Sequence, residues 1–332
     1  MKNIIKHAHP NRLAFPFIIA IGLLILVSLP ADAQPKKSPE KIKAIMVGDR
    51  VVDVSFNLGV LPEAMSVRCS IWPMCKQLLN ASQVLGCPRC IVDRIPNIVP
   101  DTAKERGIKR IIIEKHPNFC IYNPNMKPAN VVALLKGKDL TIEYVDFSVG
   151  LEEAIRQTAS LLKRETEGEA LIEKYRKDLA EAKAALPASA SGKKVIIFNG
   201  IYQHATGKVM LRVEAPGGYA DRFLLEPMGC VNVGRAFNSA NAKAVGGHYQ
   251  VAKSKGRVVL DPLIRANPDI IVMTGDAFAV QKAIAEALRS TPALLDVPAI
   301  KAHALFSLPA YVDSSVVEYP QILRLWANAL SE

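Results

Sequence analysis

The chain has 332 residues, of which 50% are hydrophobic and 22% are charged. This balance is typical of a folded globular protein and excludes a largely disordered chain. The formal net charge is +11 at pH 7, but the basic residues are interspersed with acidic ones and never form a run of five or six. That distribution argues against a nucleic-acid-binding protein.

The first 33 residues have the three-part pattern of a secretory signal peptide. Basic residues come first, an apolar stretch follows over 13–30, and the small residues Ala31 and Ala33 mark a cleavage site. A transmembrane anchor is the alternative, because the apolar stretch is almost long enough to span a bilayer. The first cysteine is Cys69, so the cleavage point offers none for a lipid anchor. We expect a soluble periplasmic protein, not a lipoprotein, whose mature chain begins with a flexible leader over 34–42.

Between residues 43 and 150, short β-branched runs alternate with amphipathic stretches. The run 110–115 holds three consecutive isoleucines, as in a strand buried on both faces of a sheet. Alternation of this kind predicts a parallel α/β sheet. The expected strands are 43–48, 64–68, 110–115 and 140–147, and the expected helices are 50–59, 75–86 and 128–137.

A long helical tract follows over 151–187, with an expected weak point at Gly168. Its second part, 166–186, has charged residues at i, i+4 spacing and a narrow apolar stripe. We expect this part to bridge two lobes; a helix lying on the surface of one lobe is the alternative.

A second α/β series completes the chain. We therefore expect two Rossmann-like lobes with parallel sheets, over 43–150 and 188–332, bridged by the helical tract 151–187. In open parallel sheets ligands bind beyond the carboxyl ends of the strands, which predicts a ligand cleft between the lobes. The expected strands are 194–199, 268–276 and 304–309, and the expected helices are 217–229, 260–266, 277–290 and 319–330.

Five segments in this order resemble a known family. The chain is similar to the periplasmic substrate-binding proteins of ABC importers whose lobes are bridged by one long helix, a class that includes vitamin B12-, haem- and ferric-siderophore-binding proteins. The likeness covers nearly all of 43–330, but residues 69–127 fit the family poorly. The segments are VSFNLGVLPEAMSV (54–67), the tract 151–186, GGYADRFLLEPMGCVNV (217–233), LIRANPDIIVMTGD (263–276) and LLDVPAIKAHALFSLP (294–309).

The resemblance implies a two-lobed clamp, working as a monomer, that closes on its ligand and docks on an inner-membrane permease with its ATPase. It implies that Asp101 and Asp261 meet permease arginines; an ordinary helix N-cap is the alternative for both. No cofactor is expected to be required. The implied ligand is an iron complex, a haem- or cobalamin-type tetrapyrrole or another chelate, with iron, cobalt and nickel as candidate metals.

Four of the six cysteines lie within residues 69–90. Paired disulfides, Cys87–Cys90 and Cys69–Cys75, are the simplest interpretation in an oxidising compartment. Two alternatives stay open. A zinc site would need a second CxxC pair, and a redox role for CPRC would need a helix to begin at Cys87, which the expected helix ending at Gly86 does not provide.

Several side chains that suit a soft metal or a tetrapyrrole directly follow or lie near expected strand ends. We expect them to line the cleft, with His116 and His204 as candidate metal ligands. Ordinary loop histidines, buried thiols and packed aromatic rings are the alternatives. The expected cleft residues are Cys69, Trp72, Met74, His116, Cys120, Tyr202, His204, Arg212, Asp276 and Tyr311.

Motifs for catalysis are missing from the sequence. It has no GxGxxG, P-loop, HExxH or GxSxG pattern, and no nucleophile, base and orienting group stand together. We therefore expect a binding protein and not an enzyme. A periplasmic metal- or thiol-dependent redox protein that reuses the two-lobe scaffold is the alternative, and a metallochaperone or sensor without a permease is a third possibility.

Overall fold

A computed structural model describes residues 38–69, 72–238, 243–254, 256–310 and 316–332. The predicted signal peptide, residues 34–37 of the predicted leader and Tyr311 lie outside these described residues. Residues 40–42 of the predicted leader belong to a strand, so the prediction of a flexible leader was wrong there. Within the described ranges, no helix is both long and apolar enough to cross a membrane.

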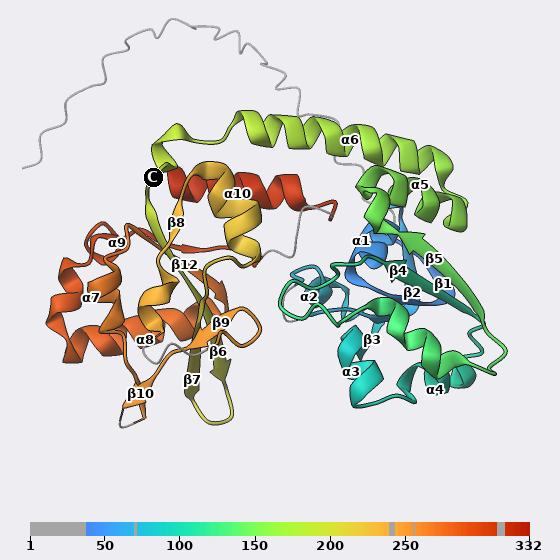
Figure 1. Ribbon diagram of the computed structural model, residues 1–332, viewed down its shortest axis with the longest axis horizontal. Helices are drawn as coiled ribbons and strands as arrows, with labels where there is room; N and C mark the ends of the chain where they lie inside the picture. The colour runs from blue at the N-terminus through green and yellow to red at the C-terminus, as the bar shows by residue number, and fades with distance from the viewer. Residues whose placement is uncertain (1–37, 70–71, 239–242, 255, 311–315) are drawn as a thin grey trace, which may run out of the picture. The chain divides into compact units, whose positions relative to one another are not determined.

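The N-terminal lobe is built on a five-stranded parallel sheet in the order β3-β2-β1-β4-β5 (Figure 1). Apolar residues on both faces of its central strands are buried in two separate core clusters, as expected for such a sheet. Helices α1 and α5 contribute to one cluster, and α3, α4 and the 3-10 helix η1 contribute to the other. The elements are β1 (Glu40–Val47), α1 (Asp49–Asn57), β2 (Val60–Ser66), α2 (Cys75–Leu78), β3 (Gln83–Gly86), α3 (Pro88–Asp93), α4 (Ile98–Glu105), β4 (Arg110–Lys115), η1 (Pro128–Leu135), β5 (Thr141–Asp146) and η2 (Phe147–Val149).

Two predicted helices of this lobe were wrong. Only the first turn of the expected helix 75–86 exists, as α2, because a turn after Leu79 leads into the edge strand β3. The expected helix 128–137 is the 3-10 helix η1.

The helical tract breaks at Lys163 and not at the predicted Gly168. Lys163 has left-handed backbone angles (φ 58°) and separates α5 (Leu151–Leu162) from α6 (Glu165–Ala184). Gly168 is instead a packing residue, since an added Cβ would lie 2.7 Å from the Cβ of Ala159 in α5.

Helix α6 contributes to the cores of both lobes. Leu171 and Ile172 are buried in the N-terminal core, whereas Ala182 is buried with the helix α10 in the C-terminal core. This division of one apolar stripe between two cores is what the bridging interpretation predicts, and Figure 1 shows α6 running along both lobes.

The C-terminal lobe has a six-stranded sheet in the order β13-β12-β6-β7-β9, with β8 also paired to β6. The prediction of a wholly parallel sheet was wrong here, because β6 turns at residues 204–207 into the antiparallel strand β7, which pairs antiparallel with β9. A separate two-stranded ribbon joins β10 and β11. The strands are β6 (Lys194–Gln203), β7 (Lys208–Glu214), β8 (Val231–Asn232), β9 (His248–Gln250), β10 (Lys253–Ser254), β11 (Arg257–Val258), β12 (Ile270–Gly275) and β13 (Leu305–Ser307).

Helices cover this second sheet. The predicted helix 277–290 is α8, whereas the predicted helix 217–229 consists of a π-helical turn, η4, and a 3-10 turn, η5. Residues of α8 belong to one core cluster and those of α10 to the other. The elements are η3 (Ala188–Ala190), η4 (Asp221–Leu225), η5 (Glu226–Met228), η6 (Gly234–Phe237), α7 (Pro262–Ala266), α8 (Ala277–Ser290), η7 (Pro292–Asp296), α9 (Pro298–Lys301) and α10 (Tyr319–Ser331).

Candidate ligand-binding cleft

A cavity of about 750 Å³ is lined by residues of both lobes. Its size is within the range typical of small-molecule sites. The N-terminal lobe contributes the end of β2, the start of α3 and the loop after β4, and the C-terminal lobe contributes β6, β7, β9 and β12. The polar and sulfur-bearing lining residues are Arg68, Cys87, Arg89, Asp93, Cys120, Tyr122, Asn123, Asn125, Met126, Lys127, Asn130, Asn199, Arg212, Glu214, His248 and Thr274.

Arg68 is a buried cation at the carboxyl end of β2. It exposes 3% of its surface and forms an ion pair with Asp49, which also accepts a hydrogen bond from the Arg68 backbone N–H. The guanidinium lies over the Phe119 ring, 3.8 Å from its centroid, and Nη1 donates to the Phe119 carbonyl. Burial by itself lowers the pKa of Arg68, but Asp49 together with Tyr219, Cys120 and Glu114 raises it above its usual value, so the side chain stays charged. Its Nη2 is buried and has no hydrogen-bond partner among the described residues.

A second buried ion pair supports this position. Arg50 pairs with Glu114, whose side chain is fully buried at the end of β4. Burial raises the pKa of Glu114, and the Arg50 charge opposes that rise. Gly48 (φ 127°) is required here, because an added Cβ would lie 2.4 Å from the Glu114 side chain. The carboxyl end of the N-terminal sheet therefore holds Arg68 among buried, paired charges.

Arg212 is the corresponding cation on the other lobe. It lies on β7, and its Nη2 donates to Asn199 Oδ1 at 2.7 Å. Asn199 in turn donates to Thr274, which donates to the Phe198 carbonyl. Burial lowers the pKa of Arg212, and its Nε is buried without a hydrogen-bond partner among the described residues. Both walls of the cavity thus carry an arginine with an unused N–H group.

The loop after β4 contacts the C-terminal lobe. Tyr122 donates a hydrogen bond to Glu214 Oε1 at 3.1 Å, and its ring packs edge-on against Tyr219 at 5.0 Å. Tyr219 accepts a hydrogen bond from the Ile121 backbone N–H. Gly247 leaves room for this contact, since an added Cβ would lie 2.1 Å from the Tyr122 ring.

Two titratable groups beside Tyr122 have shifted pKa values. Burial raises the pKa of Glu214 to about 7, although hydrogen bonds from Ala220 and Tyr122 oppose the shift. Burial lowers the pKa of His248, whose Nδ1 lies 2.8 Å from the Gly246 carbonyl. Desolvation also raises the pKa of Tyr122, so its hydroxyl remains a donor.

The pattern of the periplasmic binding protein family matches residues 127–312, more than half of the chain. The chain belongs to this family. A substrate-binding role for the protein follows from that membership, and the resemblance expected from the sequence is confirmed.

Solved structures of low sequence identity share the two-lobed fold of this binding protein. The periplasmic heme-binding protein RhuT from Roseiflexus sp. RS-1, in apo form, is 14% identical with a TM-score of 0.56, covering 88% of this chain and 98% of that chain. A periplasmic heme-binding protein from Pseudomonas aeruginosa is 17% identical with a TM-score of 0.52, covering 87% and 92%. FeuA from Bacillus subtilis, a triscatecholate siderophore-binding protein complexed with ferri-bacillibactin, is also 17% identical with a TM-score of 0.52, covering 87% of this chain and 92% of that chain. No curated protein is similar enough to count as a match.

Of the predicted cleft residues, the cavity of the binding protein includes Cys120 and Arg212. Trp72 is fully buried, and its Nε1 donates to Glu318 at 3.1 Å, so it is a packing residue. Met74 precedes α2 and packs against the N-terminal core, as does Cys69. These three residues were wrongly placed in the cleft, because the chain folds back on the lobe after Arg68.

The β6–β7 hairpin moves two more predicted residues away from the cavity. Tyr202 packs edge-on against His204 and Phe278, and His204 is exposed in the turn. Asp276 caps α8 by accepting a hydrogen bond from the Ala279 backbone N–H at 3.3 Å. None of the three lines the cavity.

His116 also does not line the cavity. Its Nδ1 accepts a hydrogen bond from the Asn118 backbone N–H at 3.1 Å, within the loop after β4. Neither of the two candidate metal ligands, His116 and His204, therefore lines the cavity. Across the described ranges, no three His, Cys, Asp or Glu side chains converge in a way that could hold a metal ion.

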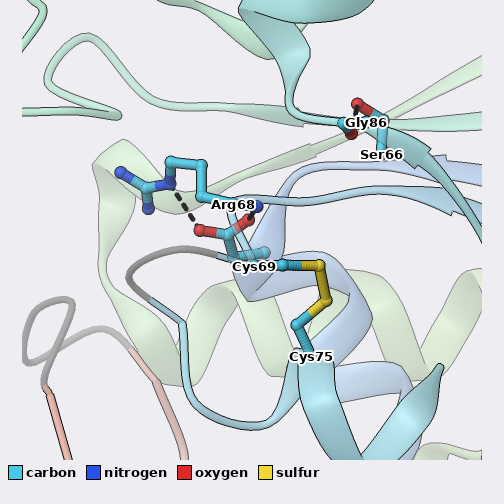
Figure 2. The surroundings of a disulfide bond; sticks show 6 residues. Ser66, Arg68, Cys69, Cys75 and Gly86 are labelled. Carbon is cyan, nitrogen blue, oxygen red and sulfur yellow. Dashed lines mark hydrogen bonds and ion pairs between the residues drawn. A yellow bond between two sulfur atoms is a disulfide. The ribbon is translucent and has the colours of Figure 1, made fainter. Parts of the chain in front are cut away.

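The cysteines differ in state. Cys69 and Cys75 form a disulfide that closes the loop carrying Trp72, directly after Arg68 (Figure 2). The predicted Cys87–Cys90 bond is not formed; both residues are free thiols whose Sγ atoms lie 2.9 Å apart.

The two predicted docking acids are exposed, and neither caps a helix with its side chain. Asp101 lies in the first turn of α4, where Asn97 occupies the N-cap position. Asp261 precedes α7 without a side-chain capping bond, and accepts a hydrogen bond of 3.4 Å from Thr291. The N-cap alternative is therefore not supported for either residue.

Proposed function

We propose that this protein captures an anionic metal chelate in the cleft and delivers it to the permease of an ABC importer. The observation that carries the proposal is the pair Arg68 and Arg212. They lie on opposite lobes, line one cavity, and each has a buried N–H group without a partner among the described residues. A buried donor left unsatisfied costs about 1–3 kcal/mol, more when it is charged, so the cleft favours a ligand that supplies acceptors.

The guanidinium groups define the ligand class. Arginine presents a planar fork of donors that matches carboxylates and other oxyanions. Arg89 and Lys127 add positive charge to the same cavity, although Arg89 is partly offset by its ion pair with Asp93. Haem propionates and catecholate oxygens are anionic groups of this kind, and both occur in ligands named for the structural relatives.

Recognition is proposed to act on the outer groups of the chelate and not on its metal. This follows from the lining, because the cavity contains no convergent set of metal-binding side chains among the described residues. Iron, cobalt and nickel complexes therefore remain candidates, provided that their chelator carries negative charge. Contacts to one arginine on each lobe would favour the closed clamp, which a ligand held by one lobe cannot do.

Ligand titrations test this function. The probes are haemin and a ferric triscatecholate, both anionic, with a neutral ferric trishydroxamate as the matched chelate. Arg212→Gln should weaken binding of the anionic probe at least about tenfold, because a charge-assisted hydrogen bond is lost. Lys208→Gln removes an exposed positive charge from the same strand and should leave the affinity unchanged. Equal affinity of Arg212→Gln and the unchanged protein, or equal binding of the neutral chelate, would contradict the proposal.

Delivery to a permease is proposed to use Asp101 and Asp261. Asp261→Ala should leave ligand affinity within a factor of about two and should reduce uptake by cells, because a charge that attracts the permease is lost. Asp296→Ala, which removes another exposed carboxylate of the same lobe, is the control. Normal uptake with Asp261→Ala would remove that residue from the docking surface.

A further inference from the structure

Cys87 lies at the wall of the cleft, with Cys90 beside it. The strand β3 ends at Gly86 and α3 begins at Pro88, so Cys87 is the residue that precedes the helix. This corrects the expectation of a helix ending at Gly86. The Cys87 sulfur accepts a hydrogen bond from the Cys90 backbone N–H at 3.2 Å and lies 2.9 Å from the Cys90 sulfur.

The pair is connected to the cavity through α3. Cys87 lines the cavity itself, and the same short helix contributes Arg89, Val92 and Asp93 to the wall. Both thiols are only partly buried, whereas the Cys230 thiol is buried in the other lobe and bonds to the Ala190 carbonyl. The Cys87–Cys90 pair is therefore within reach of a reagent and of a ligand in the cleft.

We propose that Cys87 and Cys90 are a reversible dithiol–disulfide pair in the ligand cleft, and that oxidation of the pair lowers the affinity for the chelate. The second half rests on the function proposed above. The partner reagent is a disulfide, either a small molecule or a thiol–disulfide oxidoreductase.

The oxidation of the cysteine pair proceeds by thiol–disulfide exchange, in two successive displacements. One thiolate of the pair attacks a sulfur of the reagent RSSR, forming a mixed disulfide and releasing RS⁻. The second cysteine, after losing its proton, attacks the mixed disulfide, forms the Cys87–Cys90 bond and releases the second RS⁻. The pair loses two electrons and two protons, and RSSR is reduced to two RSH. The short loop needs little movement, since a disulfide requires its sulfurs to approach to about 2.05 Å.

Oxidation changes what the cleft offers. In the reduced state Cys87 presents an S–H group and a soft sulfur to the cavity. In the oxidised state that S–H group is lost and the first turn of α3, with Arg89, is tied covalently to Cys87. Burial raises the pKa of Cys87 to about 11, so the reduced form is a neutral thiol near pH 7, and a catalysed exchange is expected to be faster than a spontaneous one.

The first experiment needs no ligand. The full mature protein is equilibrated in glutathione buffers of graded potential, alkylated, digested and mapped by mass. We expect residues 87 and 90 to change together from two alkylated thiols to one disulfide, while Cys69–Cys75 stays oxidised and Cys230 stays reduced. A pair that stays reduced in excess oxidised glutathione, or that resists dithiothreitol in the folded protein, overturns the proposal.

The second experiment measures the affinity for haemin and for the ferric triscatecholate in both redox states. Whichever of the two probes binds more tightly should bind the reduced protein at least about fivefold more tightly than the oxidised protein. A fivefold change in affinity is about the lower end of the range typical of coupling between two sites. Cys90→Ser keeps the Cys87 thiol and cannot form the bond, so it should behave as reduced protein in both buffers. Cys87→Ser lacks that thiol and should behave as oxidised protein in both. Cys230→Ser should respond as the unchanged protein does.

The outcomes separate the two proposals. Identical affinities of both redox states overturn the redox coupling and leave the function standing. If neither probe binds the reduced protein, the proposed function fails and the coupling fails with it, whereas the alkylation result still decides whether the cysteine pair cycles.

Discussion

The Tyr122 hydroxyl of the N-terminal lobe donates a hydrogen bond to Glu214 of the C-terminal lobe, with an O–O distance of 3.1 Å. The same hydroxyl accepts a hydrogen bond from the Tyr219 backbone N–H at 3.3 Å. Tyr122 therefore holds the two lobes together from inside the cavity that it lines. Protein groups therefore already bridge the lobes, so the proposed closure on a ligand would not depend on the ligand alone.

Tyr122→Phe tests this contact. The variant keeps the ring but removes the donor to a buried carboxylate, so the free energy of unfolding should fall by about 1–3 kcal/mol. The lobes should also separate more readily, which would raise the radius of gyration measured by small-angle X-ray scattering and weaken haemin or triscatecholate binding severalfold. Tyr144→Phe, on the partly exposed surface of β5, is the matched control and should change none of these quantities. An unchanged radius of gyration and affinity in Tyr122→Phe would show that the bond does not control closure.

Glu214 should make stability depend on pH. Its pKa is raised from 4.5 to about 7 by burial, so between these values the folded state binds more protons than the unfolded state. Stability from this residue is therefore greatest at acid pH, falls as the pH rises from about 4.5 through 7, and is constant above that range. Urea unfolding of the native protein and of Glu214→Gln at pH 5 and pH 8 measures the effect.

The comparison with Glu214→Gln isolates this residue from other groups. The glutamine oxygen can still accept from Tyr122 and Ala220, so the packing is kept. Raised pKa values of Glu114 and Asp221 act in the same direction and the lowered pKa of His248 acts in the opposite one, but they occur in both proteins. The native protein should lose more stability between pH 5 and 8 than the variant. Equal losses would mean that Glu214 is not the group that titrates.

Part of this site could be predicted from the sequence, because ligands bind beyond the carboxyl ends of strands. This rule places Arg68 at the cavity, yet that residue was included in the predicted strand 64–68 and so was not considered as a ligand contact. The strand β2 ends at Ser66, which frees Arg68 to meet Asp49 and Phe119. Pairing of this kind joins residues far apart in the chain, and composition or periodicity does not predict it.

The hairpin that displaced Tyr202 and His204 had a sequence signal. Val209, Leu211 and Val213 alternate with other residues and are buried, as in a strand with one buried face, and Gly207 (φ 63°) closes the preceding turn. The contact between Tyr122 and Glu214 had no such signal. It depends on the loop after β4 meeting an antiparallel strand of the other lobe, in a region that fits the family resemblance poorly.

The Cys69–Cys75 disulfide should stabilise the loop that carries Trp72. Its cysteines are six residues apart, so the entropy model predicts about 2 kcal/mol of stabilisation. In a Cys87→Ser/Cys90→Ser background, Cys69→Ser/Cys75→Ser should lower the free energy of unfolding by that amount. Treatment of the background protein with a reductant should lower it equally. A background protein that is insensitive to the reductant, with an equally stable double variant, would show that the bond contributes nothing.

The bridging role of α6 can be separated from a role in stability alone. A proline at Ala180, an exposed position of α6 that follows its N-terminal core contacts, removes a backbone hydrogen bond and should cost about 3 kcal/mol or more. Ala180→Gly is the matched control and should cost about 1 kcal/mol without bending the helix. Because Leu171 and Ala182 belong to the cores of different lobes, a bend between them should also misalign Arg68 and Arg212 and weaken binding of the triscatecholate probe. If Ala180→Pro lowers the unfolding free energy but binds the probe with unchanged affinity, α6 supports one lobe and does not set the geometry of the cleft.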